Sequence, residues 1–210
     1  YLKYGIEYTL NLLDGVFAFV LIDYNIDQLF VARDPYGVRP LFELRNKDNI
    51  CRNKKDNLIG FASEMKQLVN FSNNDNYIIR QFTPGTYSSY ELINNIWVIN
   101  NEDIRYNSFN LNKIIDEDEE VEISEILEII HDTFSEAVRK RVETTDRPVA
   151  CLLSGGLDSS IVTALVNKYY PGELETYSIG LENSEDLKYA REVATFLETK
   201  HTEIIVTEED

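Results

Sequence analysis

The chain has 210 residues, enough for one large domain or two small ones, and 43% of them are hydrophobic, as in ordinary globular proteins. Its net charge of −17 argues against sequence-independent binding to nucleic acid or to an anionic membrane surface. It has no apolar run of about 18 residues and no signal-like start, and neither Cys51 nor Cys151 has metal-ligand spacing. These features predict a cytoplasmic protein without a disulfide framework or a membrane span.

The first 90 residues are predicted to form strands that follow one another directly. The apolar run at 15–24 predicts a strand covered on both faces, and a polar turn leads from it into a second strand at 29–33. Further strands are expected at 38–44, 58–62 and 85–90, with a turn at 34–37 and a short helix at 63–69 capped by Ser63. This order predicts part of an α+β domain over residues 1–90.

Strands and helices are predicted to alternate in the second half of the chain. Residues 91–121 lose hydrophobic periodicity and accumulate Asn and Asp, which predicts a surface linker. A helix is then expected from Ile123 to Arg141, followed by strands at 149–153, 174–180 and 202–206 and helices at 159–168 and 186–198. The alternation predicts the start of a doubly wound parallel α/β sheet over residues 122–210. Ser154 and Ile179 fall at the carboxyl ends of strands, where such sheets bind ligands, and Ile179 is expected to pack on an adenine face.

The most informative stretch follows the strand at 149–153 and reads Ser-Gly-Gly-Leu-Asp-Ser-Ser from Ser154 to Ser160. Paired glycines let a backbone bend and approach a ligand closely, and the N–H groups of the helix that follows point at an anion. The serines add hydroxyl donors, and Asp158 suits a Mg²⁺ ion that also binds phosphate oxygens. An ordinary strand–turn–helix corner is the alternative, but the complete string after a buried strand favours a Mg-pyrophosphate site.

The string lacks the Lys of the common nucleoside triphosphatase loop and instead resembles the SGG-x-DS motif of the ATP-pyrophosphatase (PP-loop) enzymes. Over nearly its whole length the chain resembles glutamine-hydrolysing asparagine synthetases of the eukaryotic type. In the first half the blocks LDGVFAFVLID, VARDPYGVRPLF, FASEMKQL and FTPGTY carry the resemblance; in the second they are CLLSGGLDSSIV, TYSIGLENSEDLKYAREVA and HTEII. The RD-x-x-G-x-RPL pattern alone is less specific, because phosphoribosyl amidotransferases share it.

The resemblance implies two domains and a two-stage synthesis. Residues 1–90 would be the C-terminal part of an Ntn-type αββα amidotransferase domain, and residues 122–210 the N-terminal part of the synthetase domain. The substrates would be glutamine, aspartate and ATP with Mg²⁺; ammonia from glutamine would displace AMP from β-aspartyl-AMP. A homodimer is also implied.

The resemblance also assigns residues to the ATP site. Six of them match the pyrophosphate loop, namely Ser154, Gly155, Gly156, Asp158, Ser159 and Ser160, with Asp158 as the Mg²⁺ ligand. Two more, Leu153 and Ile179, match positions that contact the nucleoside. The amidotransferase signature residues Arg33, Asp34, Gly37, Arg39 and Pro40 are expected to be mainly structural.

The chain departs from the family pattern at its start. The family nucleophile is an N-terminal Cys followed by Gly, whereas Tyr1 stands first here and the only methionine is Met65. The blocks for glutamine and for aspartate are also missing, so no catalytic residue is assigned and the chain is expected to be a fragment without glutaminase or synthetase activity. Cys51 and Cys151 are expected to be inert thiols, and His131 and His201 to have packing or surface roles.

Two rival interpretations remain open. A β-lactam synthetase joins the same two domain types, although the RDPYGVRPLF and SEDLKYAREVA blocks favour asparagine synthesis. A non-catalytic remnant that keeps only nucleotide binding is the rival of another class.

Overall fold

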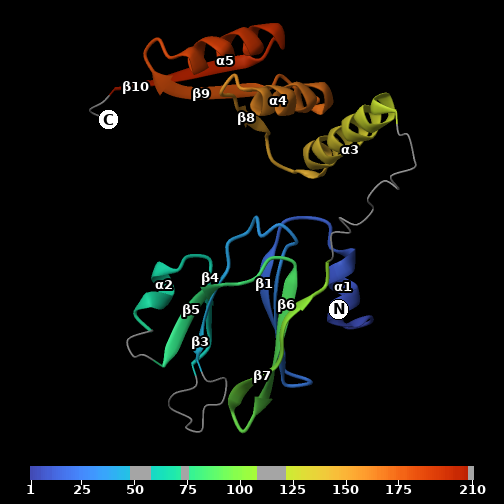
Figure 1. The fold of residues 1–210 in the computed structure, drawn as a ribbon, viewed down its shortest axis with the longest axis vertical. Coiled ribbons are helices and arrows are strands. Elements are labelled where there is room, and N and C mark those ends of the chain that lie inside the picture. The colour runs from blue at the N-terminus through green and yellow to red at the C-terminus, as the bar shows by residue number, and fades with distance from the viewer. Residues whose placement is uncertain (48–57, 72–75, 108–121, 208–210) are drawn as a thin grey trace. The chain divides into compact units, whose positions relative to one another are not determined.

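The computed structural model describes residues 1–47, 58–71, 76–107 and 122–207, and these fall into two compact units, 1–113 and 114–210 (Figure 1). The first unit contains the helices α1 (Gly5–Leu12) and α2 (Lys66–Val69) and the strands β1 (Ala18–Asp23), β2 (Gln28–Arg33), β3 (Phe42–Asn46), β4 (Gly60–Ala62), β5 (Tyr77–Gln81), β6 (Thr86–Ile93) and β7 (Ile96–Arg105). The second contains α3 (Ile123–Thr144), β8 (Ala150–Leu152), α4 (Leu157–Tyr169), β9 (Glu175–Leu181), α5 (Glu185–Phe196) and β10 (Lys200–Val206). Within these ranges, no helix combines the length and the apolar composition needed to cross a membrane.

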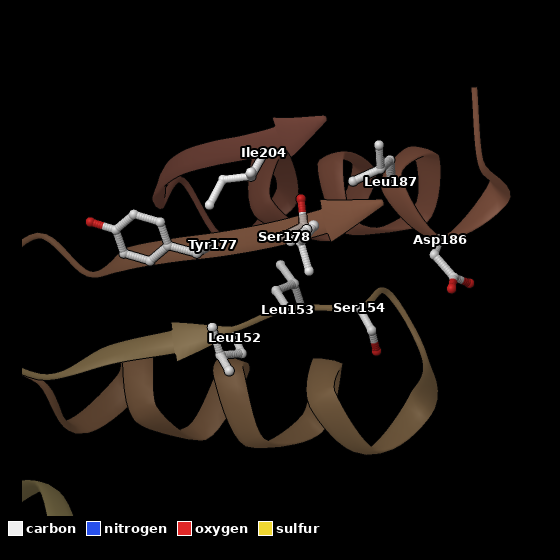
Figure 2. A pocket seen from close by; sticks show the side chains of 9 residues that line it. Leu152, Leu153, Ser154, Tyr177, Ser178, Asp186, Leu187 and Ile204 are labelled. Atoms are coloured by element: carbon white, nitrogen blue, oxygen red, sulfur yellow. The ribbon is translucent and has the colours of Figure 1, made fainter. Parts of the chain in front are cut away.

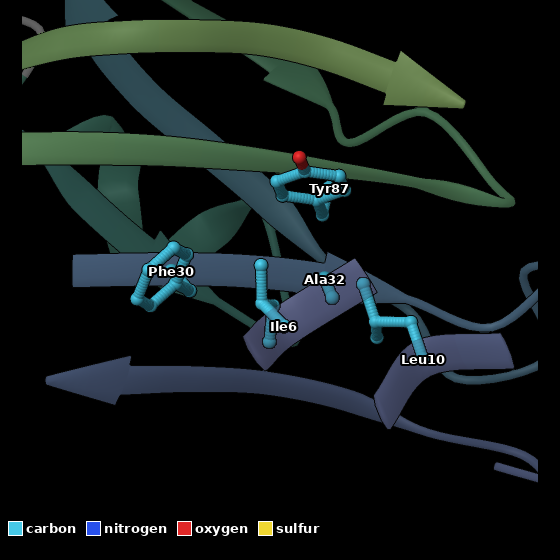
Figure 3. Packing of buried hydrophobic residues seen from close by; sticks show 5 residues of the cluster. All are labelled: Ile6, Leu10, Phe30, Ala32 and Tyr87. Carbon is cyan, nitrogen blue, oxygen red and sulfur yellow. The ribbon is translucent and has the colours of Figure 1, made fainter. Parts of the chain in front are cut away.

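The first unit is built from two antiparallel sheets with helices outside them. One sheet has the order β1-β2-β6-β7 and the other β4-β3-β5. Helix α1 packs on one face of the larger sheet, where Ile6 and Leu10 meet Phe30, Ala32 and Tyr87 (Figure 3). On the other face of that sheet, a second buried cluster includes Leu29 and Val31 of β2 and Tyr90 of β6, together with Leu41 and Phe82. Strand β2 is therefore buried on both faces, because its alternate side chains point to opposite sides of the sheet.

The strand at 15–24 was expected to be covered on both faces, and this prediction was wrong for β1. Val20 and Ile22 are 41% and 39% exposed. Among the described residues, β1 is the outermost strand of its sheet, whereas β2 lies between β1 and β6 and is covered on both faces. The apolar composition of β1 does not distinguish these two positions.

The two sheets are also joined by a partly buried network of charges. Glu43 of β3 is fully buried and accepts hydrogen bonds from Arg80 Nε of β5 at 2.7 Å and from the Tyr90 hydroxyl of β6. The remaining guanidinium nitrogens of Arg80 donate to both carboxylate oxygens of Asp103 on β7, at 2.6 and 3.0 Å. Burial alone would lower the pKa of Arg80, but these carboxylates raise it, so the guanidinium stays charged between the sheets.

The predicted linker at 91–121 was wrong for its first part. Residues 91–93 belong to β6 and residues 96–105 form β7, which pairs with β6 in an antiparallel hairpin. Asn94 and Asn95 both adopt positive φ, 53° and 61°, as the two-residue turn of a tight hairpin requires. The rest of the predicted linker, from residue 108, lies outside the described residues. Helix α1 and strand β5 were not predicted, and Ser63 does not cap α2, whose N-cap is Met65.

The second unit contains a parallel sheet with the order β10-β9-β8. Its alternating elements agree with the predicted ones to within a few residues. Helices α4 and α5 lie side by side, since Asn167 of α4 donates to the Leu197 carbonyl at the end of α5 at 2.9 Å, and α3 packs on α4. Each new strand is added on the same side of the previous one, whereas a doubly wound sheet also adds strands on the other side of the first. The described residues therefore show a parallel α/β sheet but not its doubly wound extension.

We expect Asp34→Asn to destabilise the first unit, because this buried carboxylate organises the turn after β2. It accepts hydrogen bonds from the backbone N–H groups of Tyr36, Val38 and Arg39. Burial opposes ionisation, but these N–H groups hold the pKa of Asp34 below its usual value of 3.8. A carboxyl with a lowered pKa stabilises the fold above its unfolded value, and that stability is lost as the pH falls through the folded value.

The measurement is urea denaturation at pH 7 and at pH 3. We expect the free energy of unfolding of the variant to be about 1–3 kcal/mol below that of the wild type at pH 7, and the difference to be smaller at pH 3. The control is Asp146→Asn, since that side chain is 93% exposed. If Asp34→Asn lowered the free energy of unfolding equally at both pH values, the role of the ionised Asp34 carboxylate would be contradicted.

Candidate functional site

The loop between β8 and α4 is shaped by Gly155, which packs directly on helix α5. Gly155 has φ +77°, and a Cβ atom there would lie 2.5 Å from the Ala190 backbone nitrogen and 2.6 Å from Tyr189 Cβ. Leu153, just before the loop, is 1% exposed and packs on Ala190 and Ala194 of the same helix. The absence of a side chain at Gly155 therefore lets the loop approach α5, whereas the sequence suggested an approach to a ligand.

Gly156 differs from Gly155 because its missing side chain leaves open space. A Cβ there would meet only Ser154 Oγ, at 3.5 Å, and its φ of −74° is accessible to any residue. The fold alone thus does not require glycine at this position. The open space would let a ligand approach the start of α4 closely.

The N-terminus of α4 has free backbone donors. Its N-cap is Gly156, and no side chain caps the helix, whereas Ser184 caps α5 by accepting from the Leu187 N–H at 3.5 Å. The first N–H groups of a helix have no partner within the helix. Those of α4, from Leu157 to Ser159, are accordingly available to an anion, and the helix dipole favours negative charge at this end.

The serine hydroxyls of the loop bind the loop itself. Ser159 Oγ and Ser160 Oγ donate to the Gly156 carbonyl at 3.1 and 2.7 Å, and Ser154 Oγ lies 3.0 Å from Ser159 Oγ. The Gly156 N–H donates weakly to Ser154 Oγ at 3.4 Å. The hydroxyls therefore hold the loop in shape, and the backbone N–H groups of α4 are the principal donors left for a ligand.

A cavity of about 480 Å³ opens beside the carboxyl ends of β8 and β9 (Figure 2). Its lining consists of Leu152, Leu153, Ser154, Tyr177, Ser178, Ile179, Asp186, Leu187 and Ile204, and we call it the first cavity. Of the predicted residues it brings together Leu153, Ser154 and Ile179. Ile179 is 66% exposed, which leaves its side chain free to contact a ligand.

Asp158 and Ser159 line a different cavity, of about 390 Å³, on the other side of Leu152. We call it the second cavity; its wall includes Cys151 and Val166. Asp158 has no hydrogen-bond or ion-pair partner among the described residues, so its carboxylate is available. The residues of the predicted pyrophosphate loop are thus divided between the two cavities, and Leu152 lines both.

Several cavity residues escaped the sequence-based assignment. Leu152 is 84% exposed, whereas its neighbour Leu153 is buried, because alternate residues of a strand face opposite sides of a sheet. Leu152 pairs with Tyr177, and Ile179 pairs with Ile204, so all four side chains lie on one face. Strand alternation would have revealed Leu152, but the pairing partners depend on the strand order.

The cysteine and histidine predictions have mixed outcomes. Cys151 is buried, and burial raises the pKa of its thiol, which suits the predicted inert role; Cys51 lies outside the described residues. His131 is exposed on α3 and lies 3.0 Å from Asp132 Oδ1. His201 is only 11% exposed and contacts the hydroxyls of Thr176 and Ser178, so it belongs to a buried polar cluster.

Comparison with known proteins finds a similar family model for each part of the chain. Residues 1–101 match the family model described as glutamine amidotransferase domain, and residues 130–210 match the model described as asparagine synthase. The fold is mixed α/β, and its two parts are similar to these two family models. Among solved structures, an NH3-dependent NAD synthetase from Campylobacter jejuni is 20% identical, with a TM-score of 0.33, and the match covers 37% of this chain and 35% of that one.

The more specific relatives are asparagine synthetases. The asparagine synthetase [glutamine-hydrolyzing] of Rattus norvegicus is 37% identical over 224 residues, that of Homo sapiens 37% over 226, and that of Gallus gallus 36% over 226. Each match covers 100% of this chain and 38% of the relative. The chain is therefore similar to glutamine-hydrolysing asparagine synthetases along its whole length, and it spans little more than a third of theirs.

Gly155→Ala and Gly156→Ala should have opposite effects on stability and on ligand binding. We expect Gly155→Ala to lower the melting temperature strongly, because the new Cβ overlaps the backbone of α5 and the backbone is in the left-handed region. Gly156→Ala should change the melting temperature little and instead weaken the binding of inorganic pyrophosphate with Mg²⁺. Thermal unfolding followed by circular dichroism, with and without pyrophosphate, checks both. Equal destabilisation by the two variants would refute the division of roles.

Proposed function

We propose that this chain is part of an enzyme that makes asparagine from aspartate and glutamine at the expense of ATP, through β-aspartyl-AMP. The observation that carries the proposal is the uncapped start of α4 beside an apolar cavity, in a chain homologous to asparagine synthetases throughout. An anion-binding helix end next to a flat apolar wall suits the triphosphate and the base of a nucleotide.

The two cavities suggest how a nucleotide would lie. The base would pack against the exposed side chains of Leu152 and Ile179 in the first cavity. The phosphates would extend past Ser154 toward the N–H groups at the start of α4. Leu153 would contribute backbone atoms, since its side chain is buried against α5. Ligands of parallel sheets bind at this end of the strands.

The chemistry is a transfer of AMP followed by a displacement. The side-chain carboxylate of aspartate forms a bond to the α-phosphorus, the bond from that phosphorus to the bridging oxygen breaks, and pyrophosphate leaves. Ammonia then attacks the activated carbonyl, forms the amide and releases AMP. The N–H groups of α4 would stabilise the charge that develops on the leaving pyrophosphate, because they are already oriented and need no reorganisation.

Asp158 fits a role as Mg²⁺ ligand. Its carboxylate is unpartnered and lies in the first turn of α4, where it would otherwise repel phosphate. No group of three or more metal-binding side chains occurs within the described ranges, so the protein offers one carboxylate and the phosphates and water would complete the coordination. Mg²⁺ favours such sites, and when bound it neutralises phosphate charge.

The first unit supports the proposal of an Ntn-type αββα amidotransferase domain. Its layers run from α1 through the two sheets to α2, whose Leu68 packs beside Leu44 and Gly60 on the outer side of β3 and β4. The domain would extend at least to Arg105, because β7 belongs to its larger sheet. Arg33 supports a structural role for the signature turn, since it donates to the carbonyls of Gly37, Arg39 and Phe82 at 2.6–2.7 Å.

The direct test is protection of the folded chain by MgATP. A ligand that binds only the native state increases the free energy of unfolding, by about 2.7 kcal/mol when its concentration is a hundred times its Kd. The melting temperature rises as a result. We expect millimolar MgATP to stabilise the 210-residue chain and Asp158→Ala to abolish most of the shift. Asp132→Ala is the matched control, because that carboxylate is 72% exposed on α3.

Three results would contradict the proposal or a part of it. The absence of any shift with the wild-type chain would count against a nucleotide site. A shift that Asp158→Ala leaves intact would refute the assigned metal ligand. Adenylation of a carboxylate other than aspartate by the full-length protein would favour the β-lactam synthetase alternative.

A further inference from the structure

His201 bridges two hydroxyl groups on the neighbouring strand. It lies opposite Thr176 in the parallel pairing of β10 with β9. Its Nδ1 is 2.9 Å from Thr176 Oγ1, and its Nε2 is 3.2 Å from Ser178 Oγ. The three residues are shielded from water: Thr176 is fully buried, Ser178 is 7% exposed and the imidazole is 11% exposed. Both ring nitrogens are thus engaged.

The hydroxyls beyond Thr176 favour one direction of the hydrogen bonds. Thr199 Oγ1 donates to the Ala194 carbonyl at 3.5 Å, and Thr176 Oγ1 lies 2.8 Å from Thr199 Oγ1. Each hydroxyl has one hydrogen, so when Thr199 gives its hydrogen to Ala194, Thr176 gives its own to Thr199. Thr176 then accepts from Nδ1–H of His201. With the single ring hydrogen on Nδ1, Nε2 accepts from Ser178.

The nearest charges are compatible with this arrangement. Glu203 Oε1 lies 3.9 Å from His201 Nε2, too far for a hydrogen bond, and both of its carboxylate oxygens are held by Arg191 at 2.7 Å. Glu203 therefore does not take the place of Ser178 as the partner of Nε2. In this arrangement Ser178 donates its hydrogen to the imidazole, and its oxygen can still accept from another partner.

We infer that His201 is a positioning residue for Ser178, and that Ser178 accepts a hydrogen bond from the nucleoside of the bound nucleotide. Ser178 also lines the first cavity, and its side chain lies on the face of β9 opposite to that of Tyr177 (Figure 2). The inference rests on the proposed function, because that function supplies the ligand. An adenine nucleoside offers two kinds of donor, the exocyclic amino group and the ribose hydroxyls.

The test is a double-mutant cycle on MgATP binding, measured by calorimetry with the 210-residue chain. The variants are Ser178→Ala, His201→Phe and the double variant; phenylalanine keeps a ring of similar size without the nitrogens. We expect each single variant to weaken binding about threefold to tenfold, the usual effect of one neutral hydrogen bond. The double variant should be no weaker than Ser178→Ala alone, because both substitutions remove the same interaction.

Two further variants separate positioning from packing. His201→Gln, whose amide oxygen can accept from Ser178, should recover part of the affinity that His201→Phe loses. His131→Phe is the control, since the chain has only two histidines and this one is 65% exposed on α3. It should bind MgATP as the wild-type chain does.

Nucleotide analogues identify the donor. If Ser178 accepts from the amino group, purine riboside triphosphate, which lacks that group, will bind the wild type and Ser178→Ala equally. If it accepts from a ribose hydroxyl, 2′-deoxy-ATP or 3′-deoxy-ATP will show this equality instead. Either pattern supports the inference.

The failure of this inference differs from that of the proposed function. If the wild-type chain does not bind MgATP, the nucleotide site itself is refuted, and the role of His201 with it. If the wild type binds and the two substitutions act additively or have no effect, only the positioning role is overturned. A preference for ATP over all three analogues that persists in Ser178→Ala also overturns it.

Discussion

The contact between Gly155 and helix α5 is the constraint on which the candidate site depends. It joins two successive strand–helix units, because a loop that follows β8 rests on a helix that follows β9. Once the loop is seated there, Leu153 is buried against Ala190 and Ala194, and Leu152 must face the opposite side of the sheet. The exposed apolar wall of the first cavity is thus a consequence of how the loop is anchored.

The capping of the two helices shows how the same local element serves different purposes. Helix α5 starts with Ser184, whose side chain satisfies one of the free N–H groups and stabilises the helix. Helix α4 starts with Gly156 and leaves these groups unsatisfied, although serines at 154, 159 and 160 lie nearby. Those serines bind the Gly156 carbonyl or each other. The serine hydrogen bonds therefore hold the loop in shape, and the N–H groups at the start of α4 remain available to an anion.

The alternation of strands and helices in the second unit could be predicted because each element has its own hydrophobic period. The loop string after β8 likewise pointed to an anion site, and the structure provides the free helix end that such a site needs. The roles within the string could not be read in this way. The two glycines are identical in sequence, and only the position of α5 shows that one of them packs against protein and the other faces open space.

The first unit was harder to predict because its strands do not differ in composition according to their place in the sheet. Strand β1 looks more apolar than its edge position warrants, and β7 looks like a linker because Asn and Asp are frequent in it. Asp103 of β7 is explained by Arg80 on the other sheet, a partner 23 residues away in sequence. The Asn94-Asn95 pair did carry a local signal for a hairpin turn, since asparagine tolerates positive φ better than most residues.

The cluster around His201 illustrates why polar residues in a strand need three-dimensional context. In the sequence, the histidine has no acid or nucleophile beside it and looks like a packing residue. In the parallel pairing it lies opposite Thr176, two residues before Ser178, so one imidazole reaches both hydroxyls. A buried polar group is costly unless it is satisfied, and the chain of hydroxyls through Thr176 and Thr199 provides that satisfaction. The cluster ends at a cavity wall, where the oxygen of Ser178 retains its capacity to accept.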